Sequence, residues 1–209
     1  MEEYLNEKEQ WQRVLAWLRE QGPWMLAGVA AAAAIFGGWG YWQKRTQQRN
    51  LAAASRYEQV IEAFSRNDVN GGFRLADDLI QSFPSTAYAD QANLAVARIQ
   101  VENKQLDPAV ARLRQVLAST KDAELALIVR LRLARVQLSQ GKADDALKTL
   151  DAVTPGAFAA RYAEVRGDVL LAKGDRDGAL KAYREARSGD STTIDTGLLD
   201  LKIGELARS

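Results

Sequence analysis

The side chains best able to do chemistry in this chain are two pairs of adjacent carboxylates. Asp77-Asp78 and Asp144-Asp145 are the kind of group that shares a proton or holds a substrate when two carboxylates converge. Neighbouring residues on a helix diverge by about 100°, so the members of a pair point in different directions. We therefore interpret both pairs as solvated helix surface.

Two glycine-containing segments match ligand-binding loops only in part. Gly174–Gly178 (GDRDG) resembles a calcium loop but lacks its third acidic position and its distal glutamate, so turn chemistry is the preferred interpretation. Gly71-Gly72 is not followed by the Lys-Ser/Thr pair of a phosphate-binding loop. Neither segment predicts a metal or a cofactor.

The chain contains no histidine and no cysteine. This excludes Ser-His-Asp and Cys-His catalysis, thiol chemistry, disulfides and nearly all structural zinc sites. The 28 Lys and Arg residues nearly balance the 27 Asp and Glu residues, which argues against nucleic acid as a partner. The sequence therefore predicts a protein that is not an enzyme and uses no cofactor.

A charge-free segment lies near the N-terminus, at residues 23–42. Its ~20 residues would span about 30 Å as a helix, the thickness of the hydrocarbon core of a bilayer. Trp24 stands at one end, and Trp39, Tyr41 and Trp42 stand at the other, where interfacial aromatics are expected. We predict a transmembrane helix over residues 23–43, in contact with membrane lipid.

Three other interpretations of this segment are open: a buried soluble helix, a cleaved signal peptide, and an anchor weakly inserted because it is rich in Ala and Gly. An acidic rather than basic preceding tail argues against cleavage. Residues 1–22 are predicted as a tail, either amphipathic helix or disordered, and residues 44–50 as a juxtamembrane linker. Flanking Lys and Arg counts lean slightly towards a cytoplasmic C-terminal domain, without deciding the orientation.

The remaining chain, residues 51–209, carries an internal repeat. Equivalent alanines stand at Ala76, Ala109, Ala146 and Ala179, at intervals of 33, 37 and 33 residues. The residues at i+4 are Ile80, Leu113, Leu150 and Tyr183, and those at i+7 are Phe83, Val116, Val153 and Ala186. This spacing defines one helical face, in which a small residue lets two helices approach closely.

A period near 34 with helix–turn–helix units is typical of tetratricopeptide repeats. Gly141 and Gly174 occupy the same place in the inter-helix turns, and Pro84 and Pro155 follow the ends of second helices. A closing helix is predicted from Leu198, Leu199, Leu201, Ile203 and Leu206. The predicted fold is all-α: a transmembrane helix followed by an α-solenoid of hairpins with a C-terminal capping helix. The alternative is a non-repeating helical bundle.

Such a stack can bind polypeptide along the concave side formed by its first helices. Repeat alignment places nine residues in this possible protein-binding groove: Gln91, Leu94, Arg98, Ile128, Leu131, Arg135, Arg161, Glu164 and Asp168. The alternative for each is a solvent-facing or core position.

Three stretches of the chain resemble the YfgM family of ancillary subunits of the bacterial SecYEG translocon. They are the start, with Tyr4, Glu7 and Gly22 leading to GWGYW (Gly38–Trp42); the central LRLARVQL and ADDALKTLD (Leu131–Asp151); and the terminal LLDLKIGEL (Leu198–Leu206). The likeness covers nearly the whole chain, and its central block is the most specific part.

The resemblance implies a single-pass protein of the bacterial inner membrane, with its N-terminus cytoplasmic and its repeats periplasmic. It implies association with SecYEG and with the membrane-anchored prolyl isomerase PpiD. It also implies transfer of unfolded secreted clients to periplasmic chaperones. Arg45 and Arg49 after the span depart from the charge pattern that this topology favours. The alternative is a membrane-tethered scaffold for another envelope assembly or a stress-signalling complex.

Overall fold

The computed structural model describes residues 2–84, 86–189 and 194–208, without the side chains of several residues between 2 and 33. It forms two compact units, residues 1–51 and residues 52–209. The elements in the described ranges, all helical, are α1 (Glu2–Ser65), α2 (Val69–Ser82), α3 (Ala87–Glu102), α4 (Leu106–Ser119), α5 (Ala123–Ser139), α6 (Ala143–Asp151), the 3-10 helix η1 (Gly156–Phe158), α7 (Ala159–Ala172), α8 (Arg176–Ser188) and α9 (Thr196–Arg208).

In the first unit the structure describes the part of α1 up to residue 51, whose backbone is helical through the predicted tail, span and linker. Across the side chains that the structure describes, no helix is both long and apolar enough to cross a bilayer. The predicted span at residues 23–43 includes residues 26–30, whose side chains lie outside that description. The transmembrane helix therefore stays a prediction.

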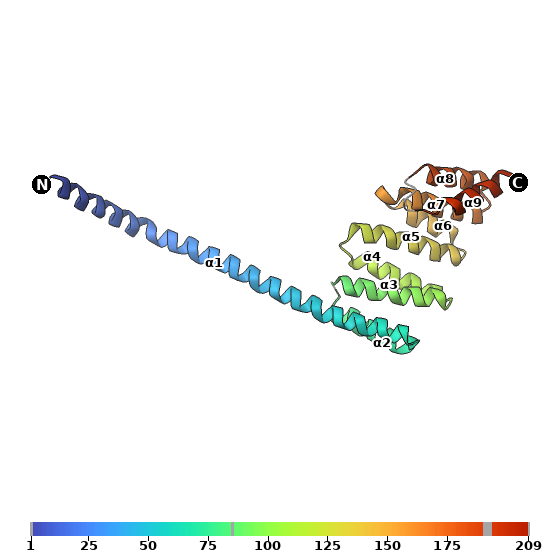
Figure 1. Cartoon of the computed structure of the whole chain (residues 1–209), viewed down its shortest axis with the longest axis horizontal. Coiled ribbons are helices and arrows are strands. Elements are labelled where there is room, and N and C mark those ends of the chain that lie inside the picture. Colours follow the sequence, from blue (N-terminus) through green and yellow to red (C-terminus); the bar gives the residue numbers. More distant parts are fainter. Residues whose placement is uncertain (1, 85, 190–193, 209) are drawn as a thin grey trace. The chain divides into compact units, whose positions relative to one another are not determined.

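The second unit is a stack of helical hairpins, each made of a first and a second helix (Figure 1). The last part of α1, residues 52–65, packs with α2, and the later pairs are α3 with α4, α5 with α6, and α7 with α8. Each second helix also packs against the first helix of the next hairpin, as α4 does against α5. This succession is the predicted solenoid, and the all-helical repeat fold is confirmed.

The four equivalent alanines are fully buried, as the repeat predicts. Ala76, Ala109, Ala146 and Ala179 each expose 0% of their surface. The residues four positions later are also buried, from Ile80 in the first hairpin to Tyr183 in the last. A methyl group at this crossing lets the helices of a hairpin approach, and the larger residue fills the space beside it.

The turns inside the four hairpins share one backbone conformation. Only two of these turns contain a glycine at the position with positive φ. Gly141 and Gly174, which lie in these turns as predicted, have positive φ, and Asn67 and Lys104 adopt the same conformation in the first two hairpins. In every case the next N–H donates to the carbonyl five residues before it, at 2.7–3.0 Å. This is the Schellman ending of a helix. The same turn therefore closes all four first helices, with or without glycine.

The closing helix is present as α9, but only one of its faces packs. Leu199 is 1% exposed, and Ile203 and Leu206 pack against the core formed by α7 and α8. Leu198 and Leu201, which were predicted to help cover that core, are instead 47% and 71% exposed. They lie on the opposite side of α9 because residues 199, 203 and 206 follow the helical period of about 3.6 and residues 198 and 201 do not share that face.

Candidate protein-binding groove

The acidic pairs belong to the helix surface, as predicted. Asp77 accepts a hydrogen bond from Arg112 at 2.6 Å, whereas Asp78 pairs with Arg56 on α1. The two carboxylates thus point to different cations on different helices. They hold neighbouring helices together and do not converge on a common ligand.

The pair Asp144-Asp145 behaves in the same way. Asp144 accepts a hydrogen bond from Lys173 at 2.6 Å, and Asp145 lies 4.0 Å from Lys148. The hydrogen bond and positive charge of Lys173 hold the pKa of Asp144 below its ordinary value. Asp144 therefore links α6 to the end of α7, whereas the contact of Asp145 lies within α6.

The GDRDG segment is a helix cap. Asp175 precedes α8, and its carboxylate accepts a hydrogen bond from the Gly178 N–H at 2.9 Å. Asp68 caps α2 through Gly71 in the same way, at 2.8 Å. Within the described part of the chain, no group of His, Cys, Asp or Glu residues is arranged to hold a metal ion.

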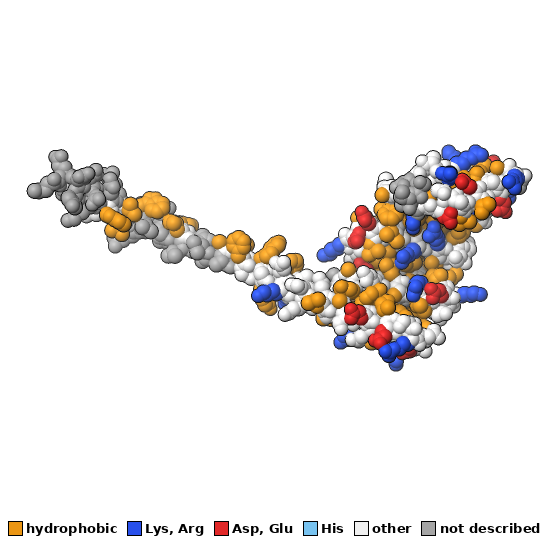
Figure 2. All heavy atoms as spheres, viewed as in Figure 1, with side chains coloured by type: hydrophobic (Ala, Val, Ile, Leu, Met, Phe, Trp, Pro, Cys, Tyr) orange, Lys and Arg blue, Asp and Glu red, His pale blue; other side chains and the backbone are white. Residues whose placement is uncertain are grey.

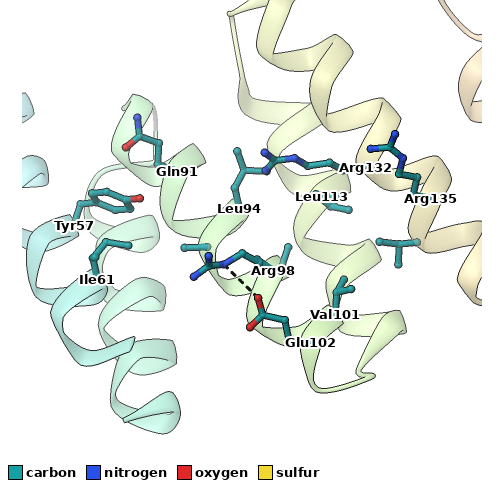
Figure 3. A pocket seen from close by; sticks show the side chains of 13 residues that line it. Tyr57, Ile61, Gln91, Leu94, Arg98, Val101, Glu102, Leu113, Arg132 and Arg135 are labelled. Atoms are coloured by element: carbon teal, nitrogen blue, oxygen red, sulfur yellow. Dashed lines mark ion pairs between the residues drawn. The ribbon is translucent and has the colours of Figure 1, made fainter. Parts of the chain in front are cut away.

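The second unit contains a groove of about 730 Å³. It lies along the first helices α1, α3 and α5, with Leu113 of α4 beneath it (Figure 3). Its lining residues are Tyr57, Ile61, Gln91, Leu94, Ala95, Ala97, Arg98, Val101, Glu102, Leu113, Arg132, Arg135 and Val136. On this side of the unit, hydrophobic side chains gather with Lys and Arg side chains among them (Figure 2).

The apolar part of the groove is open to solvent. Ile61 is 40% exposed and Val101 is 37% exposed, although both are apolar. Tyr57 is half-buried and packs its ring against Tyr88 of α3, with 6.0 Å between ring centroids. This burial raises the pKa of Tyr57, and the positive charge of Arg98 opposes the increase. The phenol is therefore neutral at physiological pH.

The charged part of the groove is predominantly basic. Arg98 pairs with Glu102 at 3.7 Å on the exposed edge of α3 (Figure 3). Arg132 and Arg135, one turn apart on α5, form no ion pair with any residue that the structure describes. The groove thus presents two available guanidinium groups beside apolar side chains.

Of the nine residues predicted to line a groove, Gln91, Leu94, Arg98 and Arg135 lie in it. Ile128, although on α5, does not. Leu131 is 4% exposed and belongs to the core between α5, α6 and α7, so its predicted role as a groove residue is wrong.

The other three predicted residues lie on α7, outside this groove. Arg161 is exposed, whereas Glu164 and Asp168 contact Lys202 of α9 at 3.2 and 2.7 Å. Asp168 also accepts a hydrogen bond from the buried hydroxyl of Tyr183 at 2.8 Å. Burial, followed by this hydrogen bond, raises the pKa of Tyr183 far above its ordinary value. The capping helix therefore occupies the carboxylates that were assigned to ligand binding.

The repeat alignment did not place the other nine lining residues in the groove, among them Tyr57, Ile61, Val101 and Arg132. A signal for the first two existed, since Tyr57 and Ile61 stand 37 residues before Leu94 and Arg98, which is an interval of the later repeats. For Arg132 no such signal was available. Its position depends on how α5 is rotated within the stack, which repeat spacing does not specify.

The amino-acid sequence is similar to a known protein family and to named bacterial proteins. A family model described as a tetratricopeptide repeat-like domain matches residues 15–208. The chain is 33% identical over 207 residues to a protein of Escherichia coli (strain K12) named ancillary SecYEG translocon subunit, covering 99% of this chain and 100% of that protein. A protein of the same name from Aggregatibacter actinomycetemcomitans is 30% identical, covering 97% of this chain and 98% of the relative.

Among solved structures, a crystal structure of MamA is similar, with a TM-score of 0.55 and 16% sequence identity. The match covers 70% of this chain and 81% of MamA. At this identity the likeness concerns the fold, and it agrees with the stacked hairpins of residues 52–209.

Proposed function

The chain belongs to the family of ancillary SecYEG translocon subunits, and from this premise we propose that it is a non-catalytic accessory of the Sec translocon. The observation that carries the proposal is the similarity over nearly the full length, which includes both the N-terminal helix and the repeats. The groove adds support, because an open apolar surface with a few charges is suited to holding polypeptide.

We propose that residues 23–43 anchor the chain in the bacterial inner membrane, between a cytoplasmic tail (1–22) and a linker (44–50). The charge-free sequence and the helical backbone of α1 support this role. Trp39 and Trp42 are 66% and 63% exposed, as aromatic side chains at a lipid interface would be. In this arrangement the repeats, residues 51–209, lie in the periplasm.

In the periplasm, the groove along α1, α3 and α5 would hold emerging secreted chains and pass them to chaperones. A membrane-anchored prolyl isomerase of the PpiD kind would be a neighbour in the same assembly. The exposed apolar residues Ile61 and Val101 are the expected contacts for a client. Holding by apolar contact needs no catalytic group and suits clients of many sequences.

Site-specific photo-crosslinking in native membranes tests the translocon assignment. A photoreactive amino acid at Trp39 should yield a covalent product with a SecYEG subunit, and the same amino acid at exposed Ala118 on α4 serves as the control. Products only with subunits of another envelope complex would contradict the proposal and favour the scaffold alternative.

Protease treatment of spheroplasts tests the topology. External protease should degrade the repeats while leaving an epitope at the N-terminus intact. Repeats that become accessible only after lysis of the inner membrane would contradict a periplasmic location.

A further inference from the structure

We propose that the groove along α1, α3 and α5 selects polypeptide segments that combine apolar side chains with carboxylates. This inference rests on the proposed role of the groove in holding polypeptide and adds a chemical preference to it. The preference follows from which charges in the groove are already paired and which are available.

The apolar residues provide the anchoring surface. Ile61 and Val101 remain 40% and 37% exposed in the folded chain, and Tyr57 and Leu94 are only half-buried. Covering such side chains removes apolar area from water, at about 25 cal/mol per Å². An occupant therefore needs apolar side chains of its own, which excludes a purely polar ligand.

The two unpaired arginines provide the charge preference. Arg132 and Arg135 line the groove and form no ion pair with described residues, whereas Arg98 pairs with Glu102. A guanidinium group forms strong paired hydrogen bonds with a carboxylate. Because the groove holds three arginines and one glutamate, basic segments would be repelled and acidic segments attracted.

The acidic residue at the repeat position equivalent to Arg135 is already bound within the chain. The repeat-equivalent position on the next first helix is Asp168, 33 residues later on α7, which packs against α5. The Asp168 carboxylate is already bound by Lys202 at 2.7 Å and by the Tyr183 hydroxyl at 2.8 Å. Lys202 and Tyr183 thus occupy the carboxylate at that position, while Arg135 forms no ion pair with a described residue.

Matched peptides test the preference with the full chain purified in detergent micelles. Three fluorescein-labelled peptides share the same leucine positions and carry Glu, Gln or Lys at all other positions. Fluorescence anisotropy should give a dissociation constant about ten-fold lower for the Glu peptide than for the Gln peptide, with the Lys peptide weakest. The difference between Glu and Gln peptides should shrink as salt concentration rises.

The double variant Arg132→Gln, Arg135→Gln should bind the Glu and Gln peptides equally. Both side chains are exposed, so the helical circular dichroism spectrum of the variant should match that of the parent chain. Arg114→Gln, at an exposed arginine of α4 outside the groove, is the matched control and should keep the ten-fold preference. A double variant that keeps the preference, or a parent chain that lacks it, overturns the inference.

A second variant separates this inference from the proposed function. Ile61→Ser with Val101→Ser should weaken the Glu and Gln peptides by the same factor. If the parent chain binds both peptides equally and this variant loses both, the groove holds polypeptide but has no charge preference, so only the inference fails. If the parent chain binds no peptide, both fail.

Anionic lipid is the remaining occupant that two arginines could attract. Short-chain phosphatidylglycerol added to the micelles should leave the affinity for the Glu peptide unchanged, as should phosphatidylcholine. The inference is overturned if phosphatidylglycerol, but not phosphatidylcholine, displaces the Glu peptide from the parent chain and the Arg132→Gln, Arg135→Gln variant no longer responds to this lipid. That result would make the groove a lipid headgroup site.

Discussion

Single small residues decide how closely the helices of this stack approach. Ala146 is fully buried and belongs to the core that joins α5, α6 and α7. Gly167 does the same for the last hairpin, where an added Cβ would lie 2.4 Å from the ring of Tyr183. Because interiors are packed as densely as organic crystals, such positions tolerate no larger side chain.

Ala146→Leu should therefore destabilise the chain by about 1–3 kcal/mol through overpacking. The measurement is urea unfolding followed by circular dichroism. Ala118→Leu, the same substitution at an exposed position of α4, should change the free energy of unfolding by less than about 0.5 kcal/mol. Equal midpoints for the two variants would refute the packing role of the alanine.

The buried tyrosine of the last hairpin links stability to alkaline pH. The pKa of Tyr183 is raised in the folded chain by burial and by the hydrogen bond to Asp168. Below about pH 10, the ordinary pKa of tyrosine, the phenol is protonated in both states and its contribution is complete. Above that pH the unfolded chain loses the proton first, so stability falls as pH rises towards the folded pKa.

Tyr183→Phe should therefore reduce the loss of unfolding free energy between about pH 10 and pH 11.5. At neutral pH the variant should already be less stable, because the hydrogen bond to Asp168 is lost. Urea unfolding across this pH range measures both effects. Parallel pH profiles for the variant and the parent chain would contradict the linkage.

At the scale of elements, a shared turn and a capping helix set the geometry of the stack. Each first helix ends in a left-handed residue followed by the same hydrogen bond, so the second helix leaves at a fixed angle. Glycine adopts this conformation without steric cost, whereas a side chain with a Cβ pays for it. The second hairpin uses Lys104, with φ of 60°.

Lys104→Gly should stabilise the chain by about 1 kcal/mol by removing that steric cost. Lys104→Ala keeps the Cβ and should leave the free energy of unfolding within about 0.5 kcal/mol of the parent chain. Gly141→Ala should destabilise by about 1 kcal/mol at the equivalent turn. A stabilising effect of both Lys104 variants would mean that the lysine charge, not the backbone, limits stability.

The capping helix is held by a partly buried cluster of charges. Lys202 is 24% exposed and contacts Glu164 and Asp168, whose side chains are 17% and 29% exposed. Its Nζ atom also lies 5.3 Å from the ring centroid of Tyr183. Removing this cation leaves two neighbouring carboxylates in a shielded position without a neutralising charge.

Lys202→Met should therefore cost about 1–3 kcal/mol in the free energy of unfolding. Arg187→Met, which removes the exposed ion pair between Arg187 of α8 and Asp200 of α9, should cost less than about 0.5 kcal/mol. Lys202→Arg should recover part of the loss. Equal effects of the two methionine variants would show that α9 is held by its apolar face alone.

At the scale of the whole molecule, the repeats let one surface strip change its chemistry along the stack. The equivalent residues of successive first helices are Ile61, Arg98, Arg135 and Asp168, which pass from apolar to basic to acidic. The backbone and the buried alanines repeat, while the residues of this strip differ from one hairpin to the next. Under the proposed function, such a strip would hold a partner polypeptide by contacts that change along the stack.

The amino-acid sequence by itself determined the helical class, the hairpin period and the buried alanines. These features follow from local spacing, which places the same residues on one helical face in every hairpin. It also identified Gln91, Leu94, Arg98 and Arg135 as groove residues, through their equivalence between repeats. Fold and family were therefore accessible before any coordinates.

The tertiary structure alone decided which first-helix residues face the groove. Leu131 and Arg132 are neighbours in sequence, yet α5 turns Leu131 into the core and Arg132 into the groove. Likewise, repeat alignment assigned Asp168 to ligand binding, but in the structure its carboxylate contacts Lys202 of α9. The physical reason is that the rotation of a helix and the contacts of a cap result from packing between segments far apart in sequence, which periodicity within one segment does not encode.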